Sequence, residues 1–382
     1  MQTYFDHNAS SPMHPEVLET ISSCLRQPIG NASSLHSTGR MARSAIETAR
    51  GQIAELVNGS VESVIFTSGG SEANNLMLKG FVDPDDSRPV VSTEIEHPSI
   101  LQPLVQLEKS GIRVTHLKVN TEGQVDLDLA QSVLKDNNPQ MLSVILANNE
   151  TGVIQPVKEL GELVDSKTCL VHTDATQAVG KIPVDMVQLG VGALTLSGHK
   201  MQGPQGIGAL IVNKNPGNIL ISGGEQEKNR RAGTENVAMI AGLGKAAQLA
   251  ALEMQQKRHH LTQLREVLET RLAAIPGVVI FGRELERLPN TTYFSLPYYH
   301  GETLLMELDR AGFALSSGSA CHSEVTSPSH VLKAMGIDDN LALNAVRVSF
   351  GSNNTLQEVE ALVSKLRELI NRLPAVIRQV AV

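Results

Sequence analysis

The sequence is poor in aromatic residues and in cysteine. It contains no tryptophan and only three cysteines, Cys24, Cys169 and Cys321, which lie far apart and form no C-x-x-C pair. A sparse, odd set of this kind argues against a disulfide framework, and without a C-x-x-C pair no cysteine-bound metal is expected. We therefore expect a reducing compartment, the cytoplasm.

Long apolar runs are also absent. The longest purely apolar runs last only a few residues, far short of the ~20 that a membrane helix needs. The N-terminal MQTYFDHNASSP has no basic region followed by an apolar stretch, so it does not resemble a secretory signal. We expect no membrane association.

The sequence has no excess of positive charge. Its 32 Lys and Arg residues stand against 40 Asp and Glu residues, which gives a net charge of −8. A duplex binder presents a basic stripe, so direct nucleic-acid binding is not expected. The exception is the short basic cluster at 228–231, whose plainest interpretation is a solvated loop. The hydrophobic fraction of 41% excludes wholesale disorder, and the length suits two or three domains of roughly 100–200 residues.

What the sequence does have is a regular alternation of short apolar runs and helical patterns. Helices are predicted at about 36–57, 71–80, 98–110, 126–136 and 156–166. This alternation is typical of an α/β fold with a mainly parallel sheet between helices. The seven predicted strands are SVIFTS (63–68), PVVSTE (89–94), IRVTHLKV (112–119), MLSVILA (141–147), TCLVHTD (168–174), ALTLSG (193–198) and IGALIVN (207–213).

A different pattern begins near the C-terminal third. A long helical pattern runs from about residue 236 to 274 and leaves open whether the helix is continuous. After Pro276-Gly277 come VVIFGR, TTYFSLP, a helix near 301–311, another near 329–335, the strand AVRVSF and a final helix to about 372. This order predicts a smaller α+β domain over 277–382.

Residues 67–75, TSGGSEANN, follow a predicted strand and open a helix. Glycines let the backbone approach a ligand closely, and the first N–H groups of a helix are unpaired and carry partial positive charge. Gly70 and Ser71 therefore form a candidate phosphate site; the alternative is that Ser71 only caps the helix. Residues 242–247, GLGKAA, match G-x-G-x-x-A, but no strand precedes them, so we interpret them as a helix-packing motif.

Several predicted strands end in polar side chains, where ligands bind in open α/β sheets. Asp174 ends one strand; the alternative is that it caps the next helix. Lys200 follows another strand, and a partly desolvated amine there would have a lowered pKa and be nucleophilic; the alternative is a solvated surface charge. His97, at a third strand end, suits acid–base chemistry, or else it is hydrogen-bonded locally.

The second domain adds two candidates. Cys321 lies in the small-residue loop SSGSACHS (316–323), where a thiol is reachable and can act as a nucleophile. Cys169 in an apolar strand and Cys24 in a helix fit the ordinary buried thiol instead. Arg347 is the one charge within AVRVSF, and such an arginine usually has an anionic partner.

A strand-end lysine, a neighbouring aspartate, a phosphate cradle and a histidine are the parts of a pyridoxal-phosphate site. With these parts in place, the sequence resembles the class V, fold-type I pyridoxal-phosphate enzymes, and among them the NifS/IscS-like cysteine desulfurases. The likeness spans nearly the whole chain in motif order: YFDHNASSP (4–12), TSGGSEANN (67–75), EHPS (96–99), NNETG (148–152), HTDATQAVGK (172–181), SGHKMQGPQG (197–206), GGEQE (223–227), RAGTEN (231–236), SSGSAC (316–321) and RVSFG (347–351).

The resemblance implies how a pyridoxal-phosphate ring would be held. Lys200 would bind the cofactor covalently, and Asp174 would pair with the pyridine nitrogen. Gln177 would donate to the phenolic oxygen, His97 would stack on the ring, and Asn149 would lie beside both cofactor and substrate. The phosphate would be held by Gly70, Ser71, Ser197 and His199, and by Thr234 from a second subunit of a homodimer.

The same resemblance implies the chemistry. Asn149 and Arg347 would bind the substrate carboxylate, and Cys321 would attack the substrate sulfur, with Lys200 and His97 as the other catalytic groups. A large cofactor-binding domain would cover 15–255. A small domain, made of 1–14 and 256–382, would carry Cys321 and Arg347.

The expected function is removal of sulfur from L-cysteine, which gives L-alanine and a persulfide on Cys321 for an acceptor protein. That acceptor would serve iron–sulfur clusters, another thio-cofactor or nucleic-acid thiolation. The family commonly has Ala-Thr-Thr at positions 9–11 and Ala-Thr at 70–71, where this chain keeps a hydroxyl with Ala-Ser-Ser and Gly-Ser. Housekeeping members also have a longer C-terminal tail that helps to dock an iron–sulfur scaffold, so that partner is left open.

Three alternatives remain at this stage. A selenocysteine lyase of the same family would act on a C–Se bond. An aminotransferase of this fold would need a keto acid and no cysteine. A regulator with a vestigial site would not bind the cofactor.

Overall fold

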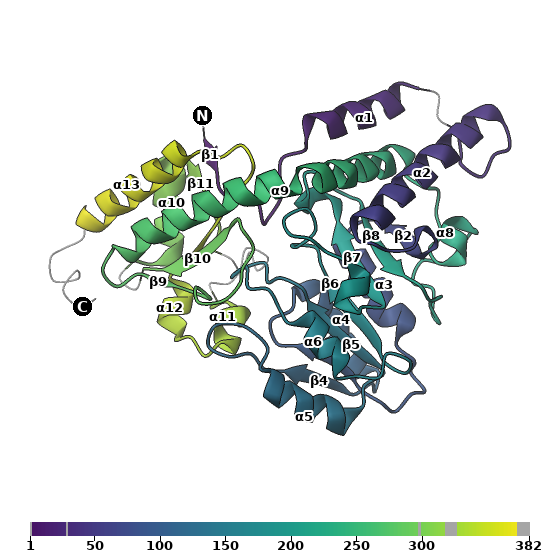
Figure 1. Ribbon diagram of the computed structural model, residues 1–382, viewed down its shortest axis with the longest axis horizontal. Coiled ribbons are helices and arrows are strands. Elements are labelled where there is room, and N and C mark those ends of the chain that lie inside the picture. Colours follow the sequence, from purple (N-terminus) through teal and green to yellow (C-terminus); the bar gives the residue numbers. More distant parts are fainter. Residues whose placement is uncertain (1, 28–29, 297–298, 318–326, 373–382) are drawn as a thin grey trace.

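The computed structural model describes residues 2–27, 30–296, 299–317 and 327–372, and its centre is a seven-stranded sheet (Figure 1). All seven predicted strands belong to this sheet. The strand β8 is antiparallel to its neighbours β2 and β7, and every other pair is parallel, so the predicted mainly parallel sheet is confirmed. Across the sheet the order is β2 (Val64–Thr67), β8 (Gly208–Val212), β7 (Ala193–Ser197), β6 (Leu170–Asp174), β5 (Met141–Ile145), β3 (Val90–Thr93) and β4 (Val114–Leu117).

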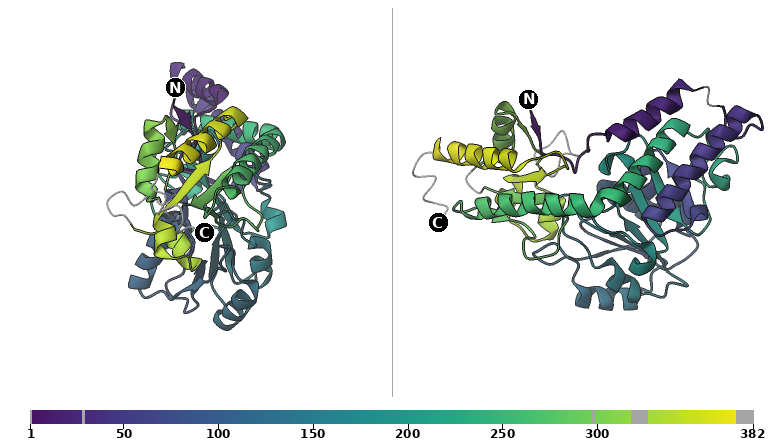
Figure 2. Two further views of the ribbon diagram at one scale, coloured as in Figure 1. Left: turned by 90° about the vertical axis from the view of Figure 1, so that its left-hand side faces the viewer. Right: turned by 45° about the horizontal axis from the view of Figure 1, so that its top comes forward.

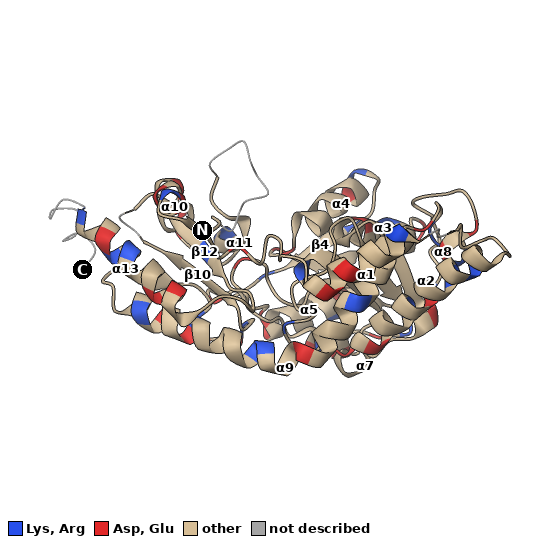
Figure 3. Cartoon of the chain, turned by 90° about the horizontal axis from the view of Figure 1, so that it is seen from above, with Lys and Arg blue, Asp and Glu red and all other residues tan. Residues whose placement is uncertain are grey.

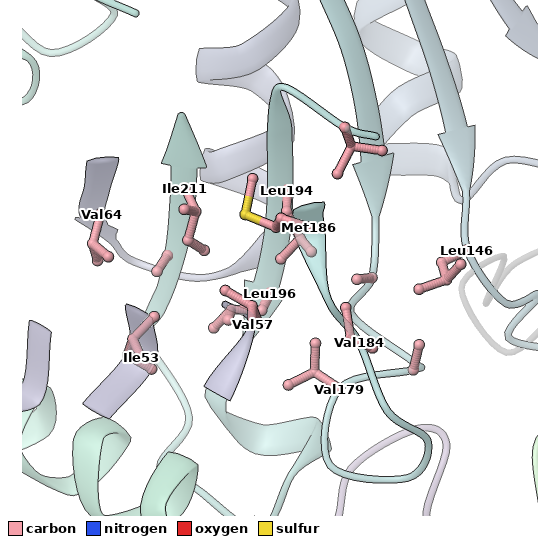
Figure 4. Close-up of a cluster of buried hydrophobic side chains, with 14 of the residues drawn as sticks. Ile53, Val57, Val64, Leu146, Val179, Val184, Met186, Leu194, Leu196 and Ile211 are labelled. Atoms are coloured by element: carbon pink, nitrogen blue, oxygen red, sulfur yellow. The ribbon is translucent and has the colours of Figure 1, made fainter. Parts of the chain in front are cut away.

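Helices cover both faces of this sheet, because successive strand residues point to opposite sides. Val64 and Phe66 of β2 belong to one core, whereas Ile65 between them belongs to the other. The first core, part of which is drawn in Figure 4, is completed by α1 (Pro15–Arg26), α2 (Ser37–Leu56), α5 (Leu127–Asn137), α6 (Val157–Glu162), α7 (Met186–Leu189) and the first half of α9 (Val237–Ala273). The second is completed by α3 (Gly70–Phe81) and α4 (Pro98–Lys109). The predicted helices are present, although α6 is shorter than expected.

The helix α9 is continuous over 37 residues and joins the two parts of the molecule (Figures 1 and 2). Leu243 and its neighbours pack in the first core of the large sheet, whereas Leu264 and Leu268 pack in a separate core near the C-terminus. By length and hydropathy α9 is the one helix in the described residues that could cross a membrane, but 56% of its apolar window is buried inside the protein. It is therefore packed as a core helix.

The motif at 242–247 lies in α9, and its glycines allow close helix contacts. A Cβ on Gly242 would lie 2.6 Å from Ile21 of α1, and one on Gly244 would lie 2.5 Å from the Cα of Ala49 in α2. The interpretation of this motif as helix packing is confirmed.

The smaller part combines short strands and helices, as predicted. The strand β10 (Thr291–Ser295) pairs antiparallel with β12 (Ala345–Ser349) and β9 (Val279–Ile280). The N-terminal β1 (Thr3–Tyr4), which was not predicted, joins this part by pairing with β11 (Phe313–Ala314). The helices are α10 (Gly301–Arg310), α11 (His330–Ala334), α12 (Asp339–Leu343) and α13 (Leu356–Arg372). The domain boundaries at residues 14 and 255 stay a prediction.

Charged side chains of both signs are interspersed along the helices. Figure 3 shows acidic and basic positions alternating on α9 and α13. One such pair, Arg271 and Glu360, joins these two helices at 2.9 Å.

Candidate active site

One pocket gathers most of the predicted site residues. Ten of the twelve residues named from the sequence line it. The other two are Cys321, which lies outside the described residues, and Thr234. The pocket is lined by Asn8, Ala9, Gly70, Ser71, Asn74, His97, Ser99, Ile145, Asn149, Asp174, Thr176, Gln177, Ser197, His199, Lys200 and Arg347.

The parallel strands bring these side chains together. Asp174 and Ser197 are the last residues of β6 and β7, and Lys200 ends the short 3₁₀ helix η2 (Gly198–Lys200) directly after β7. Carboxyl ends of parallel strands meet at one edge of a sheet, which is where open α/β sheets bind ligands. The structure thus brings the strand-end residues named from the sequence to one pocket at this edge. Arg347 comes from β12 of the smaller part.

Asp174 lies at the bottom of the pocket and is only 4% exposed. Its Oδ1 accepts from the Thr176 N–H at 3.0 Å, and its Oδ2 accepts from the Asn74 amide at 2.8 Å. No α-helix follows Asp174, so it caps a turn rather than a helix. Its two hydrogen bonds fix the carboxylate in one orientation toward the pocket.

His97 caps α4 and is linked to Asp174 through two polar side chains. Its Nδ1 accepts from the Ser99 N–H at 3.1 Å, and Ser99 Oγ lies 2.8 Å from the same nitrogen. Ser99 Oγ also accepts from the Asn74 amide at 2.8 Å. Burial lowers the pKa of His97, so the ring is neutral near pH 7 with its proton on Nε2. The predicted local hydrogen bond of His97 is confirmed. The residue also lines the pocket, and its role in acid–base chemistry stays a prediction.

The start of α3 lies at the pocket, where the sequence predicts an anion cradle. Gly69 caps this helix with a φ of 152°, which favours glycine and lets the chain turn directly from β2 into α3. Gly70, Ser71, Ser197 and His199 line the same pocket. Burial, with Lys200 and Lys181 nearby, lowers the pKa of His199 to about 4, so near pH 7 it is a neutral hydrogen-bonding group.

Lys200 is in contact with the N-terminal segment. Its Nζ donates to the carbonyl oxygens of Asn8 at 2.6 Å and Ala9 at 2.7 Å. The alternative of a solvated surface charge is wrong, because the amine lies inside the pocket.

A second lysine, Lys181, is buried behind the pocket and was not anticipated. Its Nζ donates to Gln177 Oε1 at 2.8 Å and to Asn8 Oδ1 at 3.0 Å. Burial, with Lys200 and Arg347 nearby, lowers its pKa well below the usual range. Because Lys181 donates to Oε1, the Gln177 amide is oriented with Nε2 toward Asn8, whose carbonyl oxygen accepts from it at 2.9 Å.

Arg347 does have an anionic partner, as its sequence context predicted. The partner is Asp6, whose Oδ1 lies 2.7 Å from a guanidinium nitrogen. A second nitrogen donates to the Asn149 carbonyl at 2.9 Å. The N-terminal segment thus holds Arg347 at the pocket beside Asn149.

Neither described cysteine has the low thiol pKa or the position in the pocket that a nucleophile would need. Burial raises the pKa of the Cys169 thiol to about 12 and also raises that of Cys24. Neither lines the pocket. Cys169 therefore fits the ordinary buried thiol, whereas Cys24 is only partly buried. Cys321 stays the predicted nucleophile.

Thr234 is exposed and lies outside the pocket of its own chain. Its loop is attached to the start of α3, because Arg231 contacts Glu72 at 2.8 Å. Arg230 is buried and donates to the Val64 carbonyl. The interpretation of 228–231 as a solvated loop is therefore wrong for these two arginines.

The pocket residues fit pyridoxal phosphate. A buried carboxylate suits a protonated ring nitrogen, an amine suits an aldehyde, and a helix N-terminus with hydroxyls suits a phosphate. Two buried polar atoms that line the pocket, Asn74 Oδ1 and Thr176 Oγ1, also have no partner among the described residues. Sequence reasoning missed Asn8, Asn74, Ser99 and Thr176; of these, Asn74 and Thr176 stand within motifs that it had singled out.

Comparisons with known proteins agree with this geometry. A family model described as Aminotransferase class-V matches residues 3–362. The cysteine desulfurase IscS of Dictyoglomus turgidum is 40% identical over 376 residues, which are 97% of this chain and 95% of that protein. A solved structure described as a NifS-like protein has a TM-score of 0.90 at 34% identity and covers 98% of this chain and 100% of its own. Another, described as SspA in complex with cysteine, has a TM-score of 0.80 at 29% identity over 92% of this chain and 100% of its own.

Proposed function

The chain belongs to the class-V aminotransferase family and is a cysteine desulfurase, and from this premise we propose that it moves sulfur from L-cysteine to Cys321 with pyridoxal phosphate held on Lys200. One observation carries the proposal. Ten residues assigned to cofactor and substrate from separate motifs, scattered from Gly70 to Arg347, line a single pocket around Lys200.

The cofactor would supply the electron sink, and residues of the chain would hold it. When bound, pyridoxal phosphate supplies an electron-withdrawing ring that makes the Cα proton and the Cβ–S bond of an attached amino acid reactive. Asp174, fixed by Asn74 and by the Thr176 N–H, would hold the ring nitrogen in its protonated form. Lys200, once the substrate amine has replaced it, would accept the proton from Cα and return a proton to the carbon skeleton.

Arg347 and Asn149 would bind the substrate carboxylate. Arg347 is held by Asp6 and the Asn149 carbonyl, so its guanidinium is positioned before substrate arrives. A carboxylate on a guanidinium forms a charge-assisted hydrogen bond, which fixes the orientation of the amino acid.

Cys321 would take the sulfur. Its thiolate would form an S–S bond to the substrate sulfur while the Cβ–S bond breaks, and Cβ would gain a proton to give L-alanine. Free cysteine titrates near ~8.5, so some thiolate exists at neutral pH. The persulfide would then pass to an acceptor protein.

A homodimer would complete the site. Thr234 is exposed on a loop that Arg231 ties to the start of α3, next to the anion cradle of the same chain. In a dimer this exposed hydroxyl would reach the phosphate held by the other subunit. We also propose a cytoplasmic location, because the described cysteines Cys24 and Cys169 are free thiols.

The test is mass spectrometry of the purified protein after addition of L-cysteine. We expect one added sulfur on Cys321, and borohydride reduction should fix the cofactor to Lys200. Cys321→Ser should keep the bound cofactor but form no persulfide and release almost no sulfide, whereas Cys24→Ser and Cys169→Ser should behave as the wild type. Full activity of Cys321→Ser with a keto-acid acceptor would favour an aminotransferase. Reaction with L-selenocysteine alone would favour a lyase of that substrate.

A further inference from the structure

One side chain in the pocket has no role in the scheme above. Thr176 lines the pocket, and its hydroxyl oxygen is buried and has no hydrogen-bond partner among the described residues. Buried hydroxyls are nearly always hydrogen-bonded, so an unpartnered one at a ligand pocket indicates a partner supplied by the ligand.

The position of this hydroxyl shows which part of a ligand it would meet. A Cβ built on Gly70 would lie 3.2 Å from Thr176 Oγ1 and 3.6 Å from the Cβ of Ser197. The hydroxyl therefore lies beside the first residue of α3, and the same residue lies beside the end of β7; both belong to the predicted anion cradle. The backbone of Thr176 is fixed there by its N–H bond to Asp174.

Gly70 is what makes room for this arrangement. A methyl group on residue 70 would stand closer to the Thr176 oxygen than ordinary van der Waals contact, so this oxygen would have to move by a few tenths of an ångström. The absence of a side chain at 70 and the hydroxyl at 176 thus act together: the first leaves space, and the second places a donor in it.

We infer that Thr176 is a further ligand of the cofactor phosphate, donating its hydroxyl proton to a phosphate oxygen. The inference rests on the proposed function only through the cofactor. An anionic oxygen is a strong acceptor, and the donor is already positioned, so the hydrogen bond is charge-assisted. Thr176 positions the cofactor and takes no part in bond making.

The experiment compares Thr176→Val, which keeps the side-chain shape, with Thr176→Ser, which keeps the hydroxyl. Two probes are used with each purified protein: pyridoxal phosphate and pyridoxal, which lacks the phosphate. Their dissociation constants are measured by equilibrium dialysis, and the bound phosphate is observed by ³¹P NMR.

We expect Thr176→Val to bind pyridoxal phosphate about 10-fold or more weakly, since a hydrogen bond to a charged group is lost. Its affinity for pyridoxal should be unchanged, and the ³¹P resonance of the bound phosphate should shift. Thr176→Ser should restore both properties to near the wild-type values. Equal affinity of Thr176→Val and wild type for pyridoxal phosphate would overturn the inference, and so would an equal loss for both probes.

A second comparison tests the pairing with Gly70. Gly70→Ala, which introduces the residue that the family commonly has here, should change the affinity for pyridoxal phosphate by a larger factor in the wild-type background than in the Thr176→Ala background, because the crowded atom is gone in the latter. Equal changes in the two backgrounds would overturn the pairing. Wild-type protein that binds no pyridoxal phosphate would overturn the proposed cofactor together with this inference, whereas loss of the Thr176 effect alone leaves the cofactor standing.

Discussion

Arg50 and Arg347 are both almost fully buried, with 3% and 4% of the side chain exposed, but they are held in different ways. Arg50 binds both carboxylate oxygens of Glu227 at 2.9 Å and donates to the Val64 carbonyl at 2.7 Å. Its Nε donates to Glu47. Every guanidinium nitrogen of Arg50 therefore has a partner within the chain.

Arg347 is less completely matched. It contacts one oxygen of Asp6, and its Nε is buried without a partner among the described residues. Two buried carboxyl groups show the same contrast, because Glu227 uses both oxygens whereas Glu96 Oε2 has no such partner. Of the seven buried side-chain atoms that have no partner among the described residues, three belong to residues that line the pocket, namely Asn74, Thr176 and Arg347. Polar groups beside the pocket are left open to a ligand, whereas the Arg50–Glu227 pair is complete without one.

The largest effect on the free energy of unfolding is expected from breaking the Arg50–Glu227 pair. Arg50→Met leaves the buried Glu227 carboxylate without its bidentate partner, and loss of one member of a buried pair costs about 3–5 kcal/mol. Urea unfolding of the cofactor-loaded protein should show this loss, while the KM for L-cysteine should stay at the wild-type value. The matched control is Arg271→Met, which breaks an exposed pair and should change the free energy of unfolding far less. Equal effects of the two variants would contradict the prediction.

Through Glu96, the free energy of unfolding should depend on pH with the opposite sign to that given by ordinary carboxylates. Burial raises the pKa of Glu96 from 4.5 to about 8. Between these two values the folded protein keeps a proton that the unfolded chain has lost, so the contribution of Glu96 to stability falls as pH rises. Each pKa unit corresponds to about 1.4 kcal/mol. Glu96→Gln, which keeps an oxygen for the Ile145 N–H, should therefore be as stable as wild type near pH 5 and more stable at pH 8.

The control for this prediction is the difference, at each pH, between the free energies of unfolding of Glu96→Gln and of the wild type. Burial lowers the pKa values of His7, His172 and His199 to about 4, so their contributions are lost as pH falls from about 6.5 toward 4 in both proteins. These losses cancel in the difference. Parallel curves for Glu96→Gln and wild type from pH 5 to pH 8 would show that the Glu96 proton is not held.

Removing Arg347, the less completely paired arginine, should weaken substrate binding more than it lowers the free energy of unfolding. Arg347→Ala should weaken L-cysteine binding by about 2–4 kcal/mol, because a desolvated charge-assisted pair with the substrate carboxylate is lost. The partner Asp6 is 18% exposed and can gain solvent, so the loss of stability should be smaller than for Arg50→Met. Substrate binding by the cofactor-loaded Cys321→Ser form measures this without turnover. Arg347→Lys should be intermediate, since it keeps the charge but not the planar fork. Unchanged substrate affinity of Arg347→Ala would remove Arg347 from the site.

The sequence alone was sufficient to find the strand-end residues of the candidate site, but not the residues that contact them. Strand ends carry their own signal, because short apolar runs locate the strands and the polar residue at the end of each run is plain. Asp174 and Lys200 were found in this way. The partners of these residues carry no such signal. Asn8 meets Lys181 and Lys200 only after β1 has paired with β11, and nothing near residue 8 in the sequence shows that contact.

The Arg50–Glu227 pair was missed for the same reason. Its members are 177 positions apart, and Glu227 adopts a φ of 46°, which no residue pattern in its segment suggests. Thr176 is a different case: it stood inside a recognised motif, but its role depends on the empty space above Gly70, and space of that kind is visible only in three dimensions.

The smallest effect on stability comes from packing rather than from charge. It compares two helix glycines, Gly51 and Gly244. Gly51 of α2 has nothing within 4 Å of the place where a Cβ would stand. Gly51→Ala should therefore raise the free energy of unfolding by about 0.5–1 kcal/mol, because alanine loses less backbone entropy in a helix than glycine does. Gly244 of α9, which packs on α2, is the matched opposite: its Cβ would lie 2.6 Å from that of Ala49, and overpacking should cost about 1–3 kcal/mol. Both changes add one methyl group to the same pair of helices. Any difference in stability between the two variants in differential scanning calorimetry therefore reflects the packing around each glycine. If both glycines tolerated alanine equally, the close contact between α2 and α9 would not exist, and the helix-packing interpretation of 242–247 would fail with it.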